Sequence, residues 1–152
     1  MQLADLMSTD VLAVSPGHTV ADAARRMMQR ETGVAVVLDE GGELAGVISE
    51  RDLLRVISDA ADVETPVADR MTRHVQTAAP STSIPEALAM MIEGRFRHLP
   101  IVDAGRVIGV VSMRDLMAWT AFRLQRGTDV AEDELDTAEL VATIHRMRTG
   151  AA

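Results

Sequence analysis

The second half of the chain repeats the first, and this repeat limits the possible folds more than any other feature. Residues 69–103 align with residues 5–39 at an offset of 64, with identical or similar residues recurring throughout. From Gly46 and Gly109 onward the offset is 63, because the turn before them is one residue longer in the first copy. Hairpin tips tolerate such insertions. The sequence therefore predicts two copies of one supersecondary unit.

Each copy is predicted to run strand, helix, strand, strand, helix. Short apolar runs bounded by turn residues indicate the strands, and apolar residues at helical spacing indicate the helices. The predicted strands are 11–14, 34–38 and 44–48 in the first copy, and 98–102 and 107–111 in the second. The helices are predicted to follow Thr19, Ser49, Ser83 and Ser112. Thr19 with Asp22, and Ser83 with Glu86, have the spacing of capping boxes.

Neither copy, at about 60 residues, can bury its own sheet and helices well. We therefore expect an α+β fold in which two β-α-β-β-α repeats, residues 1–62 and 63–126, pack face to face about a pseudo-twofold axis. The cleft between them would be a natural place for a ligand. Residues 127–152 are acidic with interspersed apolar side chains. They are expected to form a C-terminal amphipathic helix or a tail.

Composition removes several kinds of chemistry. The chain has no cysteine and no lysine, which excludes disulfides, thiolate metal sites, the lysine of a phosphate-binding loop and a Schiff-base lysine. Its formal net charge of −8 opposes nucleic-acid binding, which requires many phosphates to be neutralised. No apolar stretch approaches the roughly 18 residues of a membrane span, and the start lacks the pattern of a secretory signal. We expect a cytoplasmic protein with no membrane or nucleic-acid partner and no bound metal.

One motif occurs in both copies where a predicted strand runs into a helix: Gly-Val-Ile-Ser-Glu-Arg-Asp, and Gly-Val-Val-Ser-Met-Arg-Asp. The aspartate can accept hydrogen bonds from the two hydroxyls of a ribose. The serine and the amides beside it favour an anion, and the arginine can reach a phosphate. Ser-x-x-Asp is also an ordinary capping box, and the two roles are compatible. The residues concerned are Ser49, Arg51 and Asp52 in the first copy and Ser112, Arg114 and Asp115 in the second.

This motif resembles the signature of the CBS (cystathionine-beta-synthase) domain, in which a glycine and two hydrophobic residues precede Ser/Thr-x-x-Asp. Met7-Ser8 and Met71-Thr72 at the start of each copy, and the strand from His98 to Asp103, strengthen the resemblance. It covers residues 3 to about 120. It implies a tandem CBS pair that binds an adenine nucleotide, AMP, ADP or ATP, and that forms a homodimer through its helices, where Trp119 and Phe122 add apolar bulk.

The resemblance also implies which residues contact the adenine. They are Val11, Ala13, Val34 and Val36 at one site, and Val75, Thr77, His98, Leu99 and Pro100 at the other. Val36 stands where the second copy has Pro100, so the first site departs from the family pattern. Arg95, Arg97 and His98 add positive charge near the second site. We therefore expect the site with Asp115 to be the better one.

Three functions follow from these observations. The leading one is a regulatory adenine-nucleotide sensor that acts on a partner protein of unknown identity. The second keeps the fold as a ligand-independent dimerisation or docking module, and a related possibility is another adenosyl ligand such as S-adenosylmethionine or NAD(H). The third is an enzyme, which the sequence disfavours because no cysteine, lysine or histidine–carboxylate pair is apparent.

Overall fold

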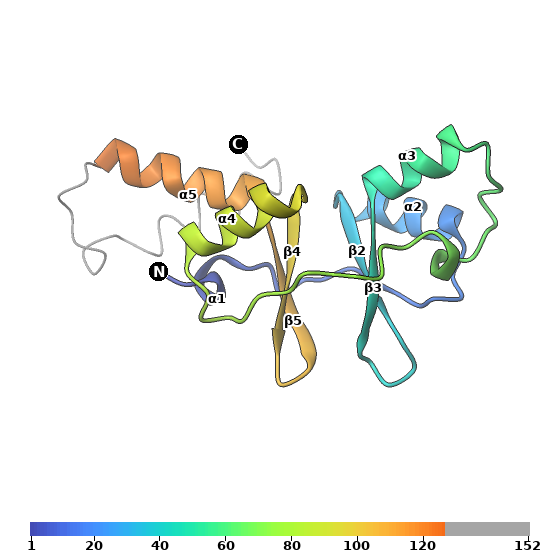
Figure 1. Cartoon of the computed structure of the whole chain (residues 1–152), viewed down its shortest axis with the longest axis horizontal. Helices are drawn as coiled ribbons and strands as arrows, with labels where there is room; N and C mark the ends of the chain where they lie inside the picture. The colour runs from blue at the N-terminus through green and yellow to red at the C-terminus, as the bar shows by residue number, and fades with distance from the viewer. Residues whose placement is uncertain (127–152) are drawn as a thin grey trace. The chain divides into compact units, whose positions relative to one another are not determined.

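The computed structural model describes residues 1–126 of the chain, and the predicted C-terminal helix or tail lies outside these residues. Two repeats of strands and helices follow one another, as predicted, in an α+β fold (Figure 1). The elements are α1 (Leu3–Leu6), β1 (Ala13–Val14), α2 (Val20–Gln29), β2 (Val34–Leu38), β3 (Leu44–Ser49), α3 (Glu50–Ser58), the 3-10 turn η1 (Val67–Asp69), α4 (Ile84–Gly94), β4 (His98–Asp103), β5 (Arg106–Ser112) and α5 (Met113–Arg126). The helices and the strands whose bounds were predicted are confirmed, with β1 shorter than expected, whereas the strand predicted to open the second copy is not among the elements of residues 1–126; α1 and η1 were not predicted.

The strands pair in the order β1-β2-β3 in the first repeat and as the hairpin β4-β5 in the second. β1 is parallel to β2, with Ala13 opposite Val36, and β2 is antiparallel to β3, with Val36 opposite Val47. The second repeat has an isolated parallel bridge between Ala78 and Ile101 at the place of the β1 pairing. The repeat therefore preserves the pairing pattern, and the lone bridge replaces a strand.

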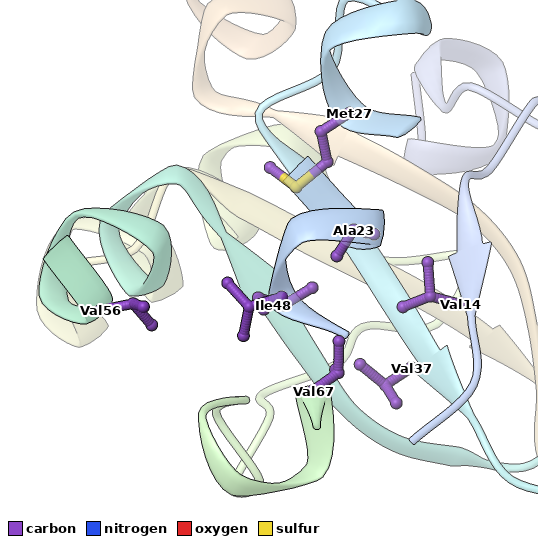
Figure 2. Packing of buried hydrophobic residues seen from close by; sticks show 9 residues of the cluster. Val14, Ala23, Met27, Val37, Ile48, Val56 and Val67 are labelled. Atoms are coloured by element: carbon purple, nitrogen blue, oxygen red, sulfur yellow. The ribbon is translucent and has the colours of Figure 1, made fainter. Parts of the chain in front are cut away.

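The two faces of β2 have different roles. Ala35 and Val37 are fully buried and belong to a core cluster that α2, α3 and η1 complete. Figure 2 shows this packing around Ile48. Val34 and Val36 alternate with the core residues, so their side chains lie on the opposite face of the sheet. The members of the cluster are Val14, Val20, Ala23, Met27, Ala35, Val37, Ile48, Val56 and Val67.

The helices begin at the predicted caps. The Thr19 hydroxyl accepts from the Asp22 amide at 3.1 Å, and the Ser83 hydroxyl accepts from the Glu86 amide at 3.4 Å. The Asp22 carboxylate, which the capping box was expected to turn back to the helix start, accepts from Arg25 at 2.7 Å. The hydrogen bond from Arg25 is the largest cause that lowers the pKa of Asp22 below its ordinary value.

The chain groups into two compact units that do not coincide with the sequence repeats. The unit around Asp115 contains Met1–Ser8, Ala78–Ile101 and the described residues from Gly109 onward. The unit around Asp52 contains Thr9–Thr77 and Val102–Ile108. The first eight residues, which open the first repeat in the sequence, thus belong to the unit that holds the second repeat's motif.

We call residues 1–8 and the equivalent residues 65–72 the lead segments. In the first lead segment, Leu3 donates its N–H to the Thr82 carbonyl at 3.0 Å, and Ser8 and Val110 exchange two backbone hydrogen bonds of 2.9 and 3.0 Å. Leu3 is fully buried. This segment therefore packs on the second repeat, whereas the sequence analysis assigned Met7-Ser8 to the start of the first repeat.

The second lead segment packs on the first repeat in the same way. Val67 donates its N–H to the His18 carbonyl at 2.8 Å, and Thr72 and Val47 exchange two backbone hydrogen bonds of 2.8 and 3.0 Å. Val67 is fully buried in the core of this unit. Each unit is thus completed by the lead segment that the sequence attaches to the other repeat.

The lead segments explain the glycine of the duplicated motif. A Cβ atom at Gly46 would lie 2.8 Å from both Met71 Sδ and the Thr72 carbonyl oxygen, and one at Gly109 would lie 2.6 Å from Met7 Sδ. These distances are shorter than van der Waals contact. A glycine is therefore required so that the methionine of the lead segment can lie directly against the strand.

Candidate ligand-binding site

Asp52 lies in the first turn of α3 and is only 4% exposed. Its Oδ2 atom accepts from the Ser49 N–H at 2.8 Å and from the Ser49 hydroxyl at 2.8 Å. Its Oδ1 atom accepts from the Arg55 guanidinium at 3.1 Å and from the Thr72 hydroxyl at 3.3 Å. A carboxylate has about four lone-pair positions. Four donors from the chain itself therefore already occupy these positions of the Asp52 carboxylate.

Asp115 occupies the same place at the start of α5 and is also 4% exposed. Its Oδ2 atom accepts from the Ser112 N–H at 2.9 Å and from the Ser112 hydroxyl at 2.7 Å, and its own N–H donates to Ser112 Oγ at 3.3 Å. The capping role of Ser-x-x-Asp is thus confirmed in both copies, and the predicted contact with a ribose stays a prediction.

We call these two strand-to-helix junctions the first corner, Ser49–Asp52, and the second corner, Ser112–Asp115. The residues behind them differ. Arg55 follows Asp52 by one helical turn, and the equivalent position after Asp115 is Ala118. An alanine side chain has no donor. An ion pair of the kind seen between Arg55 and Asp52 therefore cannot form from this position of the second copy.

The strand ends beside the corners differ in charge. The Glu50 N–H donates to the Gly33 carbonyl at 3.1 Å, and the Met113 N–H donates to the Arg97 carbonyl at 2.8 Å. These two hydrogen bonds occupy equivalent positions of the repeat. The second corner thus has an arginine where the first has a glycine, and a methionine where the first has a glutamate. At these two positions the second corner therefore has one more positive charge and one fewer negative charge than the first.

The backbone of Arg97 lies beside the second corner, and the predicted contact of its side chain with a phosphate stays a prediction. Arg97 is exposed and His98, which opens β4, is half-buried. Arg95 is the C-cap of α4 with a positive φ of 54° and is exposed. Arg51 and Arg114 are exposed in the first turns of α3 and α5. The predicted cationic residues are thus at the surface, where an anion can approach them.

The residues predicted to contact adenine lie at the strands. Val34 and Val36 are 7% and 1% exposed on the β2 face opposite the core cluster, and Ala13 lies beside Val36 in β1. Val11 is half-buried just before β1. Val34 and Val36 are thus almost completely buried, and the contact of these four residues with an adenine stays a prediction.

In the second copy, Leu99 is fully buried and Pro100 is buried in β4. The Pro100 carbonyl accepts from the Ala78 N–H at 3.0 Å. Thr77 directly precedes Ala78 along the chain, and Val75 and Thr77 group with the unit around Asp52. Their participation in the second site remains a prediction.

Two residues at the first corner were missed by the sequence analysis. Arg55 could have been found, because an acid and a base three residues apart on a helix lie on the same face. Thr72 was noted only as part of a motif, and its hydroxyl reaches Asp52 because the second lead segment pairs with β3. This contact depends on tertiary structure and has no local signal.

The CBS domain model matches residues 3–59 and again residues 65–121. The chain belongs to the CBS domain family. Each match includes one of the two corners, so the duplicated motif lies within the family match in both copies. CBS pairs carry two such domains in tandem, as this chain does.

Relatives and solved structures of similar length support this assignment. An uncharacterized 17.7 kDa protein of Acidianus ambivalens is 36% identical over 116 residues, which span 76% of this chain and 70% of that protein. The CBS domain-containing protein YhcV of Bacillus subtilis is 35% identical over 113 residues, 74% and 80% of the two chains. An uncharacterized conserved protein from Pyrococcus horikoshii has a TM-score of 0.75 and 31% identity, covering 80% of this chain and 93% of that one.

Two more distant structures of the same fold contain adenosyl compounds. A CBS domain protein from Pyrobaculum aerophilum is complexed with AMP, at 21% identity and a TM-score of 0.73, covering 81% of this chain and 100% of that one. The CBS domain pair of protein MJ0100 is in complex with 5′-methylthioadenosine and S-adenosyl-L-methionine, at 21% identity and a TM-score of 0.75, covering 80% and 97%. At this identity the likeness establishes the fold.

Two further properties concern the described residues. None of the helices within residues 1–126 is long and apolar enough to cross a membrane. Within the same range, no three histidine or acidic side chains come together as a metal ion would require. His18 instead accepts from the Ser15 N–H at 2.9 Å, so this histidine stabilises the turn before α2.

Proposed function

We propose that this CBS pair is a regulatory module that binds an adenine nucleotide and acts on a partner protein without catalysing a reaction. The observation that carries the proposal is the buried carboxylate at each corner, fixed by a serine at a helix start. A carboxylate held in one orientation suits a ribose diol, and the helix start suits a phosphate. The complexes of other CBS pairs with AMP, 5′-methylthioadenosine and S-adenosyl-L-methionine support this ligand class.

The second corner is the stronger candidate for AMP, ADP or ATP. Arg97 lies beside the start of α5 through the Met113 hydrogen bond, and Arg114 lies in the first turn. Arginine forms charge-assisted, forked hydrogen bonds with phosphate. At the first corner Glu50 would oppose the same phosphate. The ligand would regulate the partner by favouring the conformation for which it has the higher affinity.

A second function is supported by the first corner itself. Because donors of the chain engage both oxygens of Asp52, the cap is complete without a ligand. A docking module that binds no nucleotide would have this structure. The exposed apolar side chains of Met28, Leu54 and Ile57 also support a protein contact, and we propose that they take part in a homodimer.

A thermal-shift panel of AMP, ADP, ATP, S-adenosylmethionine and NADH tests the proposal. A ligand at 100 times its dissociation constant adds about 2.7 kcal/mol, which raises the Tm of a chain of this size by about 5–10 °C. Asp115→Ala should abolish most of this ligand-induced rise, and Asp52→Ala should remove less. Each rise is measured from the variant's own unliganded Tm, since both substitutions also remove a helix cap.

The panel separates the candidates. A rise with AMP, ADP or ATP and with neither other compound supports the nucleotide sensor, and a larger rise with S-adenosylmethionine or NADH would reassign the ligand. The absence of any rise would favour the docking module. Equal losses from Asp115→Ala and Asp52→Ala would contradict the ranking of the two corners.

A further inference from the structure

We propose that Arg55 occupies the position on Asp52 that a ribose hydroxyl would take, and so weakens the first corner for its ligand. The inference rests on the proposed function and names one residue of the first corner that competes with its ligand. Arg55 Nη1 lies 3.1 Å from Asp52 Oδ1, the oxygen that is not engaged by the Ser49 cap. A diol that reaches this oxygen must therefore displace a donor of the chain.

The four donors on Asp52 are not equally easy to displace. The Ser49 N–H and hydroxyl form the capping box of α3, and their loss would open the start of the helix. The Thr72 hydroxyl is held in place because the backbone of Thr72 exchanges two hydrogen bonds with that of Val47. Arg55 is different, because its side chain is 64% exposed. Its guanidinium can rotate away from Asp52 toward the solvent, where water molecules accept its hydrogen bonds instead.

Arg55 is thus a built-in competitor at the first corner. In the second copy the equivalent residue is Ala118, which cannot donate from this position. The rest of the cap is the same, with the serine N–H and hydroxyl on Oδ2 at matching distances. Arg55 is therefore one residue in which the two corners differ, and exchanging it with Ala118 should change their affinities in opposite directions.

The size of the effect follows from the exposure of Arg55. An ion pair with one exposed partner is weak in water, and displacing it changes a binding constant by up to about fivefold. Adenosine is the appropriate probe, because it has the diol and no phosphate. A phosphate would attract the displaced guanidinium and mask the competition.

The experiment measures adenosine binding by calorimetry with one corner silenced at a time. In an Asp115→Asn background, Arg55→Ala should lower the Kd of the remaining site by up to about fivefold. In an Asp52→Asn background, Ala118→Arg should raise the Kd by a similar factor. Arg70→Ala is the matched control, because it also removes a cation from an ion pair, with Asp59, in the same unit; it should leave the Kd unchanged.

The outcomes separate this inference from the proposed function. If adenosine binds but Arg55→Ala leaves its Kd unchanged or raises it, the competitor role is wrong and the proposed function stands. An equal gain in Arg55→Ala and Arg70→Ala would assign the effect to net charge and also overturn the inference. If none of adenosine, AMP or ATP binds the unsubstituted chain or any variant, the proposed function and this inference both fail.

Discussion

Replacing Gly46 by alanine tests whether the lead segment dictates the glycine of the motif. The new Cβ would lie 2.8 Å from the Thr72 carbonyl oxygen and 2.8 Å from Met71 Sδ. The sulfur belongs to a flexible side chain and can move. The oxygen cannot move alone, because it accepts the Val47 N–H at 3.0 Å. The methyl group must therefore push the second lead segment away from β3.

The magnitude follows from two opposing effects. Forcing a methyl group into a packed region costs about 1–3 kcal/mol. Alanine also restricts the unfolded chain, and this stabilises the folded state by about 0.4–1 kcal/mol where alanine can adopt the native backbone conformation. Gly46 is such a position, because it is not among the glycines with positive φ. We expect Gly46→Ala to lower the free energy of unfolding by about 1–2 kcal/mol, which is a fall in Tm of about 2–8 °C.

Gly109→Ala is the matched comparison. Its nearest atoms are Met7 Sδ at 2.6 Å, Met7 Cγ at 2.9 Å and Met7 Cβ at 3.1 Å, with no backbone atom among them. We expect a smaller loss, and Met7→Ala should restore part of it because it removes the sulfur and Cγ. Met71→Ala should not rescue Gly46→Ala, because the Thr72 oxygen remains. Urea unfolding of the unsubstituted chain, the four single variants and the two double variants measures this, and rescue of Gly46→Ala by Met71→Ala would refute the reasoning.

Three further predictions concern the surface, the phosphate and the pH dependence. Leu54→Glu with Ile57→Glu should convert a homodimer into a monomer by light scattering, because these side chains are 65% and 71% exposed; an unchanged mass would place the contact elsewhere. Arg97→Ala should weaken binding of ATP more than of adenosine by calorimetry, and equal losses would show that Arg97 does not meet the phosphates. Arg25→Ala should raise the pKa of Asp22 toward its ordinary value in an NMR titration, since the Arg25 hydrogen bond is the largest cause that lowers it. Because the folded-state pKa of Asp22 is lowered, its stabilisation is present above the unfolded-state pKa and is lost as the pH falls through the folded-state pKa; a pKa that stays low in Arg25→Ala would contradict the assignment.

The repeat made most of the fold predictable from the sequence. Local patterns located the strands and helices, because apolar periodicity and cap residues such as Thr19 and Ser83 act within a few residues. The lead segments could not be assigned to a unit in this way. Residues 1–8 are adjacent in sequence to the first repeat, and their partners Thr82 and Val110 lie far along the chain. Only tertiary hydrogen bonds decide such a pairing.

The candidate site was predictable to the extent that the motif is local. Ser49 with Asp52, and Ser112 with Asp115, form the expected caps because four consecutive residues suffice for this geometry. The surroundings of each carboxylate were not predictable at the same level. Thr72 reaches Asp52 from a segment twenty residues away. The motif therefore identifies the corner and leaves open which donors share its carboxylate.

The capping role has a consequence for how the two corners can diverge. The aspartate is needed to satisfy the helix start in both copies, whether or not a ligand binds there, so the motif persists at a corner that has lost its ligand. Residues outside the cap have no such constraint. Two such positions differ in charge here, Arg55 against Ala118 and Gly33 against Arg97, and within the corners Glu50 differs from Met113. Ligand preference should therefore follow these flanking positions, and exchanging both pairs between the copies should move nucleotide binding from the second corner to the first while leaving both caps intact.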